Sequence, residues 1–242
     1  MPENQDEMKI KQMIDELVEK AKKVICVELD KKMIKILNDR FIADDNIELI
    51  NEDVLKLDLN KLIKQEKEQN EIKDVKIVAN LPYYITTPII MKLLESRLSI
   101  DEIIVMVQKE VADRILAKPG SKDYGALTIA VNFDCTAERV LDIPPSAFIP
   151  RPQVTSTVLK IRRREKPAVE VKDRKLFFSL VKMGFGQRRK VFTNAMKSGG
   201  IPADWIPEIL EKADIDGKRR GETFSMEEYA RLADAWYDKI HE

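Results

Sequence analysis

Four consecutive residues, Asn80-Leu81-Pro82-Tyr83, hold the side chains of this chain that are best suited to chemistry. They follow an apolar run over residues 75–79 that predicts a buried strand. Open α/β sheets bind their ligands at the carboxyl ends of strands. The Asn80 amide and the Leu81 carbonyl can accept hydrogen bonds from an amine, and the Tyr83 ring offers a face on which a planar base could stack. The segment therefore predicts a site for a planar base that carries an amine.

Carboxylates follow the two preceding strand-like runs. Glu28 could accept hydrogen bonds from the hydroxyls of a ribose, and Asp53 could accept one from the amino group of an adenine-bearing cofactor. A structural alternative exists for each, because an acidic residue at such a place can also start a helix or bond its own turn. For Asp30 we prefer that alternative, as the N-cap of the next helix. Successive parallel strands end on the same side, so Glu28, Asp53 and Asn80 are expected to line one crevice.

Phe148 is a further aromatic candidate, because prolines at positions 150 and 152 restrict the backbone beside it. Its ring could form the second wall around a base that is flipped out of a nucleic acid. An aromatic side chain that fills a junction between domains is the alternative explanation.

Alternating strand-like and helix-like patterns indicate the elements that must position these residues. Strands are predicted at residues 24–27, 47–50, 75–79 and 103–107, and helices at 8–23, 31–40, 57–69, 88–98 and 109–117. This alternation favours an α/β fold with a mostly parallel sheet that is covered on both faces. Three further strands, predicted at 127–133, 138–143 and 156–162 with no helix between them, would add an antiparallel edge.

Beyond residue 164 the sequence reads as helical. Helices are predicted at 173–183, 189–198, 203–213 and 225–240, and Ser225 with Glu228 has the spacing of a capping box. We therefore expect two domains, an α/β domain over 1–165 and a small helical domain over 166–242.

The net charge of zero conceals an asymmetry. Residues 1–150 contain 22 Lys and Arg against 28 Asp and Glu, a balance of −6, and residues 151–242 contain the remaining 20 and 14, a balance of +6. Cations beside a helix start oppose the helix dipole, so phosphate contact explains them better than stability does. Ordinary solvated charge is the alternative. The two basic clusters, which point to RNA as the partner, are Arg188-Arg189-Lys190 and Lys218-Arg219-Arg220.

Composition excludes several classes of site. Cys26 and Cys135 each lie in an apolar run, which favours small buried side chains over a disulfide or a metal pair. The one histidine, His241, is the penultimate residue, so neither a histidine metal site nor a catalytic triad is expected. No apolar run is long enough to span a membrane, and we expect a monomeric cytoplasmic protein that uses no metal.

Motifs in order over residues 22–238 resemble those of the ribosomal RNA adenine N6,N6-dimethyltransferases that act on the small subunit. The turn at Asn80 resembles motif IV of methyltransferases that modify the exocyclic amine of adenine. The other motifs that carry the resemblance are Val27-Glu28-Leu29-Asp30, Asn51-Glu52-Asp53-Val54, Gln108-Lys109-Glu110-Val111-Ala112, Tyr124-Gly125, the run from Phe148 to Ser156, the run from Phe185 to Lys190, and Arg219-Arg220-Gly221-Glu222.

This resemblance implies a Rossmann-like methyltransferase sheet with a small C-terminal helical domain. It implies S-adenosylmethionine as the methyl donor and, as the substrate, two adjacent adenines near the 3′ end of small-subunit ribosomal RNA, modified on the immature subunit during ribosome biogenesis. The residues that it assigns are Asn80, Leu81, Pro82, Tyr83 and Phe148 to the base; Glu28, Asp53 and Asn80 to the cofactor; and Arg188, Arg189, Lys190, Arg219 and Arg220 to RNA.

The chain departs from the family pattern at its start. In the family, a leader, a first strand and a glycine-rich cofactor loop come before the strand that ends at Glu28, whereas the first glycine here is Gly120. We expect a gap between the strands that end at Glu28 and Asn80. The alternatives are that the two pair directly, that another chain fills the space, or that the sequence is an incomplete gene product. Two other functions remain open: a non-catalytic RNA-binding assembly protein, and a large-subunit adenine methylase of the macrolide-resistance type.

Overall fold

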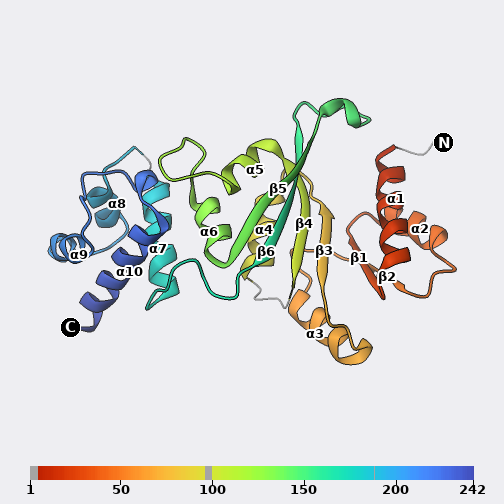
Figure 1. The fold of residues 1–242 in the computed structure, drawn as a ribbon, viewed down its shortest axis with the longest axis horizontal. Coiled ribbons are helices and arrows are strands. Elements are labelled where there is room, and N and C mark those ends of the chain that lie inside the picture. The colour runs from red at the N-terminus through yellow and green to blue at the C-terminus, as the bar shows by residue number, and fades with distance from the viewer. Residues whose placement is uncertain (1–4, 96–99, 188) are drawn as a thin grey trace. The chain divides into compact units, whose positions relative to one another are not determined.

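The computed structural model describes residues 5–95, 100–187 and 189–242 (Figure 1). Contacts divide the chain into two compact units. The first unit, called the N-terminal unit, holds residues 1–108 and 141–158, and the second, called the C-terminal unit, holds residues 109–140 and 159–242. The division predicted from the sequence, into an α/β domain over 1–165 and a helical domain over 166–242, remains a prediction. Within the described ranges, no helix is both long enough and apolar enough to cross a membrane.

The N-terminal unit begins with a two-stranded parallel sheet. Strand β1 (Val24–Glu28) pairs with β2 (Ile47–Asn51), and Glu28 lies opposite Asn51 at their carboxyl ends. Helices α1 (Gln5–Lys20) and α2 (Lys31–Arg40) lie beside these strands in Figure 1. The two helices share a small core with the sheet, to which α1 contributes Ile14, α2 contributes Leu37, and β1 contributes Cys26. This core holds the β1–β2 pair against its helices.

A second sheet has the strand order β3-β4-β6-β5. Its strands are β3 (Lys76–Asn80), β4 (Glu102–Gln108), β5 (Cys135–Ile143) and β6 (Ser156–Arg163). Strand β3 runs parallel to β4, with Asn80 opposite Met106. Strands β5 and β6 run antiparallel, since hydrogen bonds join residue 134 to 164 and residue 142 to 157. The predicted α/β class and its antiparallel edge are therefore confirmed.

The residues described agree with the gap expected between the strands that end at Glu28 and Asn80. Strands β1 and β3 belong to different sheets, and they do not pair with each other. The expectation of a fully buried strand at 75–79 is wrong, because Ile77, Val78 and Ala79 are only half-buried. Strand β3 is an edge strand of its sheet, so a neighbour covers it on one side only, whereas alternate residues of β4 are buried.

Helices α3 (Leu59–Asn70) and α4 (Thr86–Glu95) connect the parallel strands. Asp58 caps α3, and its carboxylate accepts a hydrogen bond from the Lys61 backbone nitrogen at 3.0 Å. Asp30 caps α2 in the same way and accepts from the Lys32 nitrogen at 2.8 Å, which confirms the structural role expected for it. These caps explain why each helix begins directly after its strand and turn.

The strand predicted at 127–133 is a helix, α6 (Ala126–Asp134). Most of this apolar run is buried, and a helix buried on all sides has the same unbroken apolar pattern as a buried strand. Two polar side chains one turn apart fix the helix against α5 (Lys109–Ile115). Thr128 Oγ1 donates to the Arg114 carbonyl at 2.5 Å, and Asn132 Nδ2 donates to the Ile115 carbonyl at 2.8 Å.

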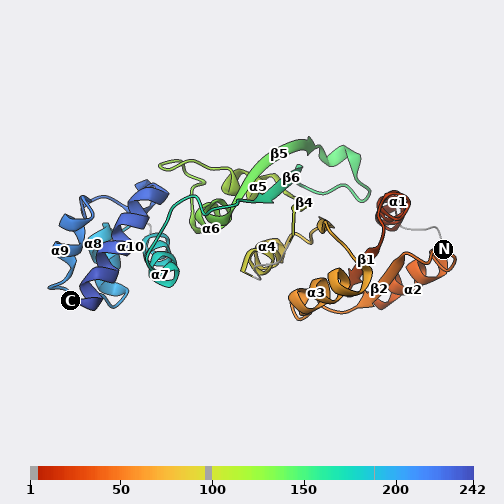
Figure 2. The ribbon, with the colours of Figure 1, turned by 60° about the horizontal axis from the view of Figure 1, so that its bottom comes forward.

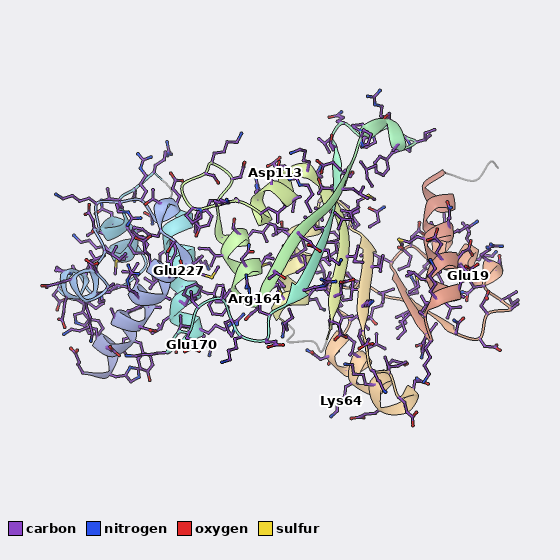
Figure 3. All side chains as sticks on the ribbon, viewed as in Figure 1. Glu19, Lys64, Asp113, Arg164, Glu170 and Glu227 are labelled. Atoms are coloured by element: carbon purple, nitrogen blue, oxygen red, sulfur yellow. The ribbon has the colours of Figure 1, made fainter. Side chains whose placement is uncertain are left out.

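Ion pairs join further elements within the C-terminal unit. Asp113, labelled on α5 in Figure 3, accepts hydrogen bonds from Lys109 on the same helix and from Arg139 on β5. The hydrogen bond from Lys109 lowers the pKa of the Asp113 carboxyl. Arg164, also labelled in Figure 3, donates from Nε to the Cys135 carbonyl at 2.9 Å. These contacts fix β5 and the end of β6 beside α5.

The rest of the C-terminal unit is helical, as predicted. Its helices are α7 (Arg174–Gly186), α8 (Phe192–Ser198), α9 (Ile206–Lys212) and α10 (Met226–His241), and Figure 2 shows them gathered together. Phe177, Phe192, Phe224 and Tyr229 are buried in their shared core, in edge-on ring contacts. The capping box predicted for α10 is present, with Ser225 and Glu228 each accepting from the other's backbone nitrogen.

Candidate active site

The turn after β3 has a fixed backbone. The Leu81 nitrogen donates to the Met106 carbonyl at 3.2 Å, which extends the pairing of β3 with β4 by one residue. The Pro82 carbonyl then accepts from the Ile85 nitrogen at 3.1 Å and from Thr86 Oγ1 at 3.0 Å. Since Thr86 is the first residue of α4, these bonds join the strand end directly to the helix start. The Asn80–Tyr83 segment is therefore held on both sides.

This turn carries two hydrogen-bond acceptors, the side-chain oxygen of Asn80 and the carbonyl oxygen of Leu81. Asn80 is exposed, and neither its side-chain amide nor the Leu81 carbonyl oxygen has a hydrogen-bond partner among the residues described. The Leu81 side chain, by contrast, is 5% exposed and anchors the turn in the core. On this fixed backbone the two oxygens are available to accept hydrogen bonds from the amine of a ligand.

Tyr83 is half-buried and held at its far end. Its hydroxyl lies 2.7 Å from Oγ of Ser156, the first residue of β6. Sequence reasoning placed Ser156 in a motif but missed this contact, for which the sequence offers no signal. The neighbouring Tyr84 is 83% exposed, and no hydrogen bond to another described residue holds its hydroxyl. Of the two tyrosines, Tyr83 is the one whose ring has a fixed end.

Phe148 lies in the connection between β5 and β6, directly after a short 3-10 helix, η1 (Pro145–Ala147). Its backbone nitrogen donates to the Pro145 carbonyl at 3.2 Å, and its side chain is half-buried. Its role as the second wall of a base pocket remains a prediction.

The carboxyl ends of β1 and β2 are joined by Asn51. Its Nδ2 donates to the Glu28 carbonyl at 2.9 Å and to the Leu29 carbonyl at 3.1 Å, a role that sequence reasoning missed. One carboxylate oxygen of Glu28 accepts from the Asp30 nitrogen at 2.8 Å. The Glu28 side chain is thus oriented by its own turn.

Asp53 has the turn geometry that was the structural alternative for it. Its Oδ1 accepts from the Leu55 nitrogen at 2.9 Å, and its backbone carbonyl accepts from the nitrogens of Lys56 and Leu57. Among the described residues, Asp53 and Glu28 each keep one carboxylate oxygen without a partner. Two oriented carboxylates with a spare acceptor each fit the hydroxyls and the amino group of a nucleoside.

Lys92 of α4 secures the loop that carries Asp53. Its Nζ donates to the Leu55 carbonyl at 2.6 Å and to the Leu57 carbonyl at 2.8 Å. These bonds join the helix that follows the Asn80 turn to the loop that follows β2. Sequence reasoning missed this lysine, because nothing in the local pattern indicates a partner 35 residues away.

Cys135 is buried, as expected, whereas Cys26 is half-buried. Burial raises the pKa of the Cys26 thiol to about 11, and burial also raises the pKa of Cys135. In the part of the chain that the structure describes, no group of three or more His, Cys, Asp or Glu side chains could hold a metal ion.

The two basic clusters lie next to each other in the C-terminal unit. The Phe192 nitrogen donates to the Arg219 carbonyl at 2.8 Å, and the Thr193 nitrogen donates to the Gly217 carbonyl at 3.1 Å. These bonds bring the segment before α8, with Arg189 and Lys190, beside the loop that carries Lys218 and Arg220. The four cationic residues, Arg189, Lys190, Lys218 and Arg220, are exposed, and Arg188 lies outside the described residues.

Arg219 differs from its neighbours because its guanidinium is engaged within the fold. It pairs with Glu228 at 2.5 Å and lies 4.6 Å from the centre of the Phe224 ring. The hydrogen bond from Arg219 is the main reason why the pKa of Glu228 is lowered. The assignment of Arg219 to RNA remains a prediction.

Comparison with known proteins identifies the family. A model of the family described as "Ribosomal RNA adenine dimethylase" matches residues 13–232. A relative from Alkaliphilus metalliredigens, "Ribosomal RNA small subunit methyltransferase A", is 49% identical over 218 residues, which cover 89% of this chain and 75% of that protein. A relative of the same name from Clostridium acetobutylicum is 48% identical over 91% of this chain and 78% of that protein.

Solved structures agree on the fold. A dimethyladenosine transferase from Plasmodium falciparum has a TM-score of 0.76 at 24% identity and covers 92% of this chain and 84% of its own. A 23S ribosomal RNA methyltransferase, ErmE, has a TM-score of 0.64 at 23% identity, and the match covers 92% of this chain and 85% of ErmE. The family match and the close relatives confirm the expectation raised by the motifs: the chain belongs to the ribosomal RNA adenine dimethylase family, whose members are methyltransferase enzymes.

Proposed function

We propose that this chain dimethylates the N6 amines of two adjacent adenines near the 3′ end of small-subunit ribosomal RNA, with S-adenosylmethionine as the methyl donor. The unpartnered acceptors of Asn80 and Leu81, on a fixed turn beside Tyr83, carry this proposal. The names of its relatives support the small subunit as substrate. We further propose that the chain acts in the cytoplasm as a monomer, on immature subunits during ribosome biogenesis.

The Asn80 side-chain oxygen and the Leu81 carbonyl would each accept one hydrogen of the adenine amine. Such bonds turn the nitrogen lone pair away from conjugation with the ring and toward the methyl group. The new N–C bond forms as the sulfonium S–C bond breaks, and the amine loses one proton to water. After the first transfer one N–H remains, so a single acceptor suffices for the second. No side chain needs to titrate.

Tyr83 would stack on the flipped adenine. It is the aromatic residue that follows Asn80 and Leu81 most closely in the sequence, and its ring offers a planar apolar face to the base. Phe148 would cover the opposite face of the base. Pro82 would hold the turn between the acceptors and the ring, since its carbonyl takes two of the hydrogen bonds that start α4.

Glu28 and Asp53 would hold the nucleoside end of the cofactor. The spare oxygen of Glu28 suits the ribose hydroxyls, and that of Asp53 suits the adenine amine. S-adenosylmethionine, when bound, supplies an electrophilic methyl group. Asn80 would lie between the two sites. Residues 5–23 form α1 and the turn after it and contain no glycine, so no residue described here is assigned to the methionine end of the cofactor.

Exposed cations of the C-terminal unit would bind the RNA backbone. Arg189, Lys190, Lys218 and Arg220 come together without a carboxylate partner among the described residues, which suits a run of phosphates. This clustering also favours the second candidate function, an RNA-binding assembly role that does not depend on methyl transfer.

Transfer of labelled methyl groups from S-adenosylmethionine to immature small subunits tests the proposal. We expect Asn80→Ala to abolish transfer and to leave RNA affinity within about twofold, because the amide contacts one base and no phosphates. If Asn80→Ala lowered methyl transfer and RNA affinity equally, Asn80 would have a structural role rather than a catalytic one. Primer extension across candidate adenines of both subunits separates the small-subunit enzyme from a large-subunit methylase. RNA binding without any transfer by the unaltered chain would favour the assembly role.

A further inference from the structure

Ser156 connects two segments that are 73 residues apart in the sequence. It is the first residue of β6, its side chain is fully buried, and its hydroxyl lies 2.7 Å from that of Tyr83. A buried hydroxyl requires a hydrogen-bond partner, and the phenol is the one that the described residues supply. The hydrogen bond therefore gives the buried Ser156 hydroxyl a partner and holds the hydroxyl end of the Tyr83 ring in place.

The next residue, Thr157, is anchored to the neighbouring strand. Its Oγ1 donates to Oδ1 of Asp142 on β5 at 2.6 Å. Asp142 and Thr157 are the two ends of the connection that carries Phe148, so this bond closes the connection at its base. Ser156 and Thr157 thus join the Tyr83 turn to the loop of Phe148 through two adjacent side chains, both of them buried.

We propose that Ser156 is a positioning residue that sets the orientation of the Tyr83 ring for the target base. This inference rests on the proposed function, in which Tyr83 stacks on the base and Phe148 covers its other face. A tyrosine side chain can adopt more than one rotamer about its first torsion, and a hydrogen bond to its hydroxyl selects one of them. That bond therefore sets where the ring lies, and stacking on a base requires one ring position. The Ser156 hydroxyl supplies that restraint from the strand that also bounds the Phe148 loop.

Four variants test the role of Ser156 in transfer: Ser156→Ala, Tyr83→Phe, the double variant and Tyr83→Ala. Ser156→Ala and Tyr83→Phe each break the same bond and keep the ring, so both should lower kcat by about 3- to 10-fold. The double variant should be no slower than either single variant, and Tyr83→Ala should be slower than all three. Affinity for S-adenosylmethionine, measured by calorimetry, should not change, and Ser146→Ala on the exposed η1 is the matched control.

Ring position is measured separately from catalysis by fluorine NMR on protein labelled with fluorotyrosine. Tyr83→Phe identifies the Tyr83 signal by removing it. We expect Ser156→Ala to shift and broaden that signal, because the ring then samples more than one orientation. A signal unchanged by Ser156→Ala overturns the proposal, as does an unchanged kcat. If the unaltered chain transfers no methyl group, the proposed function fails, and the NMR signal still decides whether Ser156 orients the ring.

Discussion

Arg219 and Glu228 form an ion pair at 2.5 Å that fixes the loop between α9 and α10. Arg219 also donates to the Thr223 carbonyl at 2.8 Å, and Glu228 accepts from the Ser225 nitrogen at 2.7 Å within the capping box of α10. The pair therefore ties the basic loop to the start of a helix. Lys218 and Arg220, on either side, are left to face solvent.

Substitutions of Arg219 and Arg220 should affect different properties, stability in the first case and RNA binding in the second. We expect Arg219→Ala to lower the free energy of unfolding by about 1 to 2 kcal/mol, because it removes charged hydrogen bonds and a ring contact. Arg220→Ala should leave stability unchanged and should weaken RNA binding, with a shallower dependence of affinity on salt. Chemical denaturation and RNA binding at several salt concentrations measure both effects. An unaltered salt slope in Arg220→Ala would remove that residue from the RNA surface.

The same ion pair predicts how stability depends on pH. The pKa of Glu228 lies below its ordinary value of 4.5, chiefly because of the hydrogen bond from Arg219. A carboxyl whose pKa is lower in the folded state contributes stability above its unfolded pKa and loses it as the pH falls through the folded value. We therefore expect Glu228→Gln to be less stable than the unaltered chain at pH 7. The difference should shrink below pH 4.5, as measured by urea unfolding across that range. A difference that stays constant with pH would show that the pair is not responsible.

Two glycines in the C-terminal unit differ in what surrounds them. A Cβ added at Gly221 would lie 2.6 Å from the Cα of Gly184 and 2.8 Å from the Tyr229 hydroxyl oxygen, whereas one added at Gly186 would meet nothing within 4 Å. We expect Gly221→Ala to cost about 1 to 3 kcal/mol of stability, since the backbones must move apart. Gly186→Ala should change stability by less than about 1 kcal/mol. Thermal unfolding of the two variants makes the comparison, and similar losses would argue against the close backbone contact.

Local patterns were enough to predict the elements that carry the candidate site. The strand before Asn80 and the helix after it follow from an apolar run, a proline and a polar turn, all close together in the sequence. The helix over 126–134 could not be predicted in this way, because an unbroken apolar run fits a buried strand equally well. Only the contacts of Thr128 and Asn132 with α5 decide between the two, and these depend on tertiary packing.

Contacts between distant segments could not be predicted at all. The bonds of Tyr83 to Ser156 and of Lys92 to Leu55 join residues 73 and 37 positions apart. The sequence shows that each side chain can form hydrogen bonds, but the partner is set by how the elements pack. The motifs therefore predict which residues hold the base and the cofactor, while the contacts that orient those residues come from the structure.

Lys92 provides a test of whether the loop after β2 serves the cofactor. Lys92→Met keeps the apolar stem but removes both hydrogen bonds to the loop that carries Asp53. We expect affinity for S-adenosylmethionine to fall by about 3- to 10-fold, because Asp53 is no longer held in place before binding. Lys61→Met, at an exposed position on α3, is the matched control and should bind as the unaltered chain does. Calorimetry gives both affinities, and equal values for Lys92→Met and Lys61→Met would separate this loop from cofactor binding.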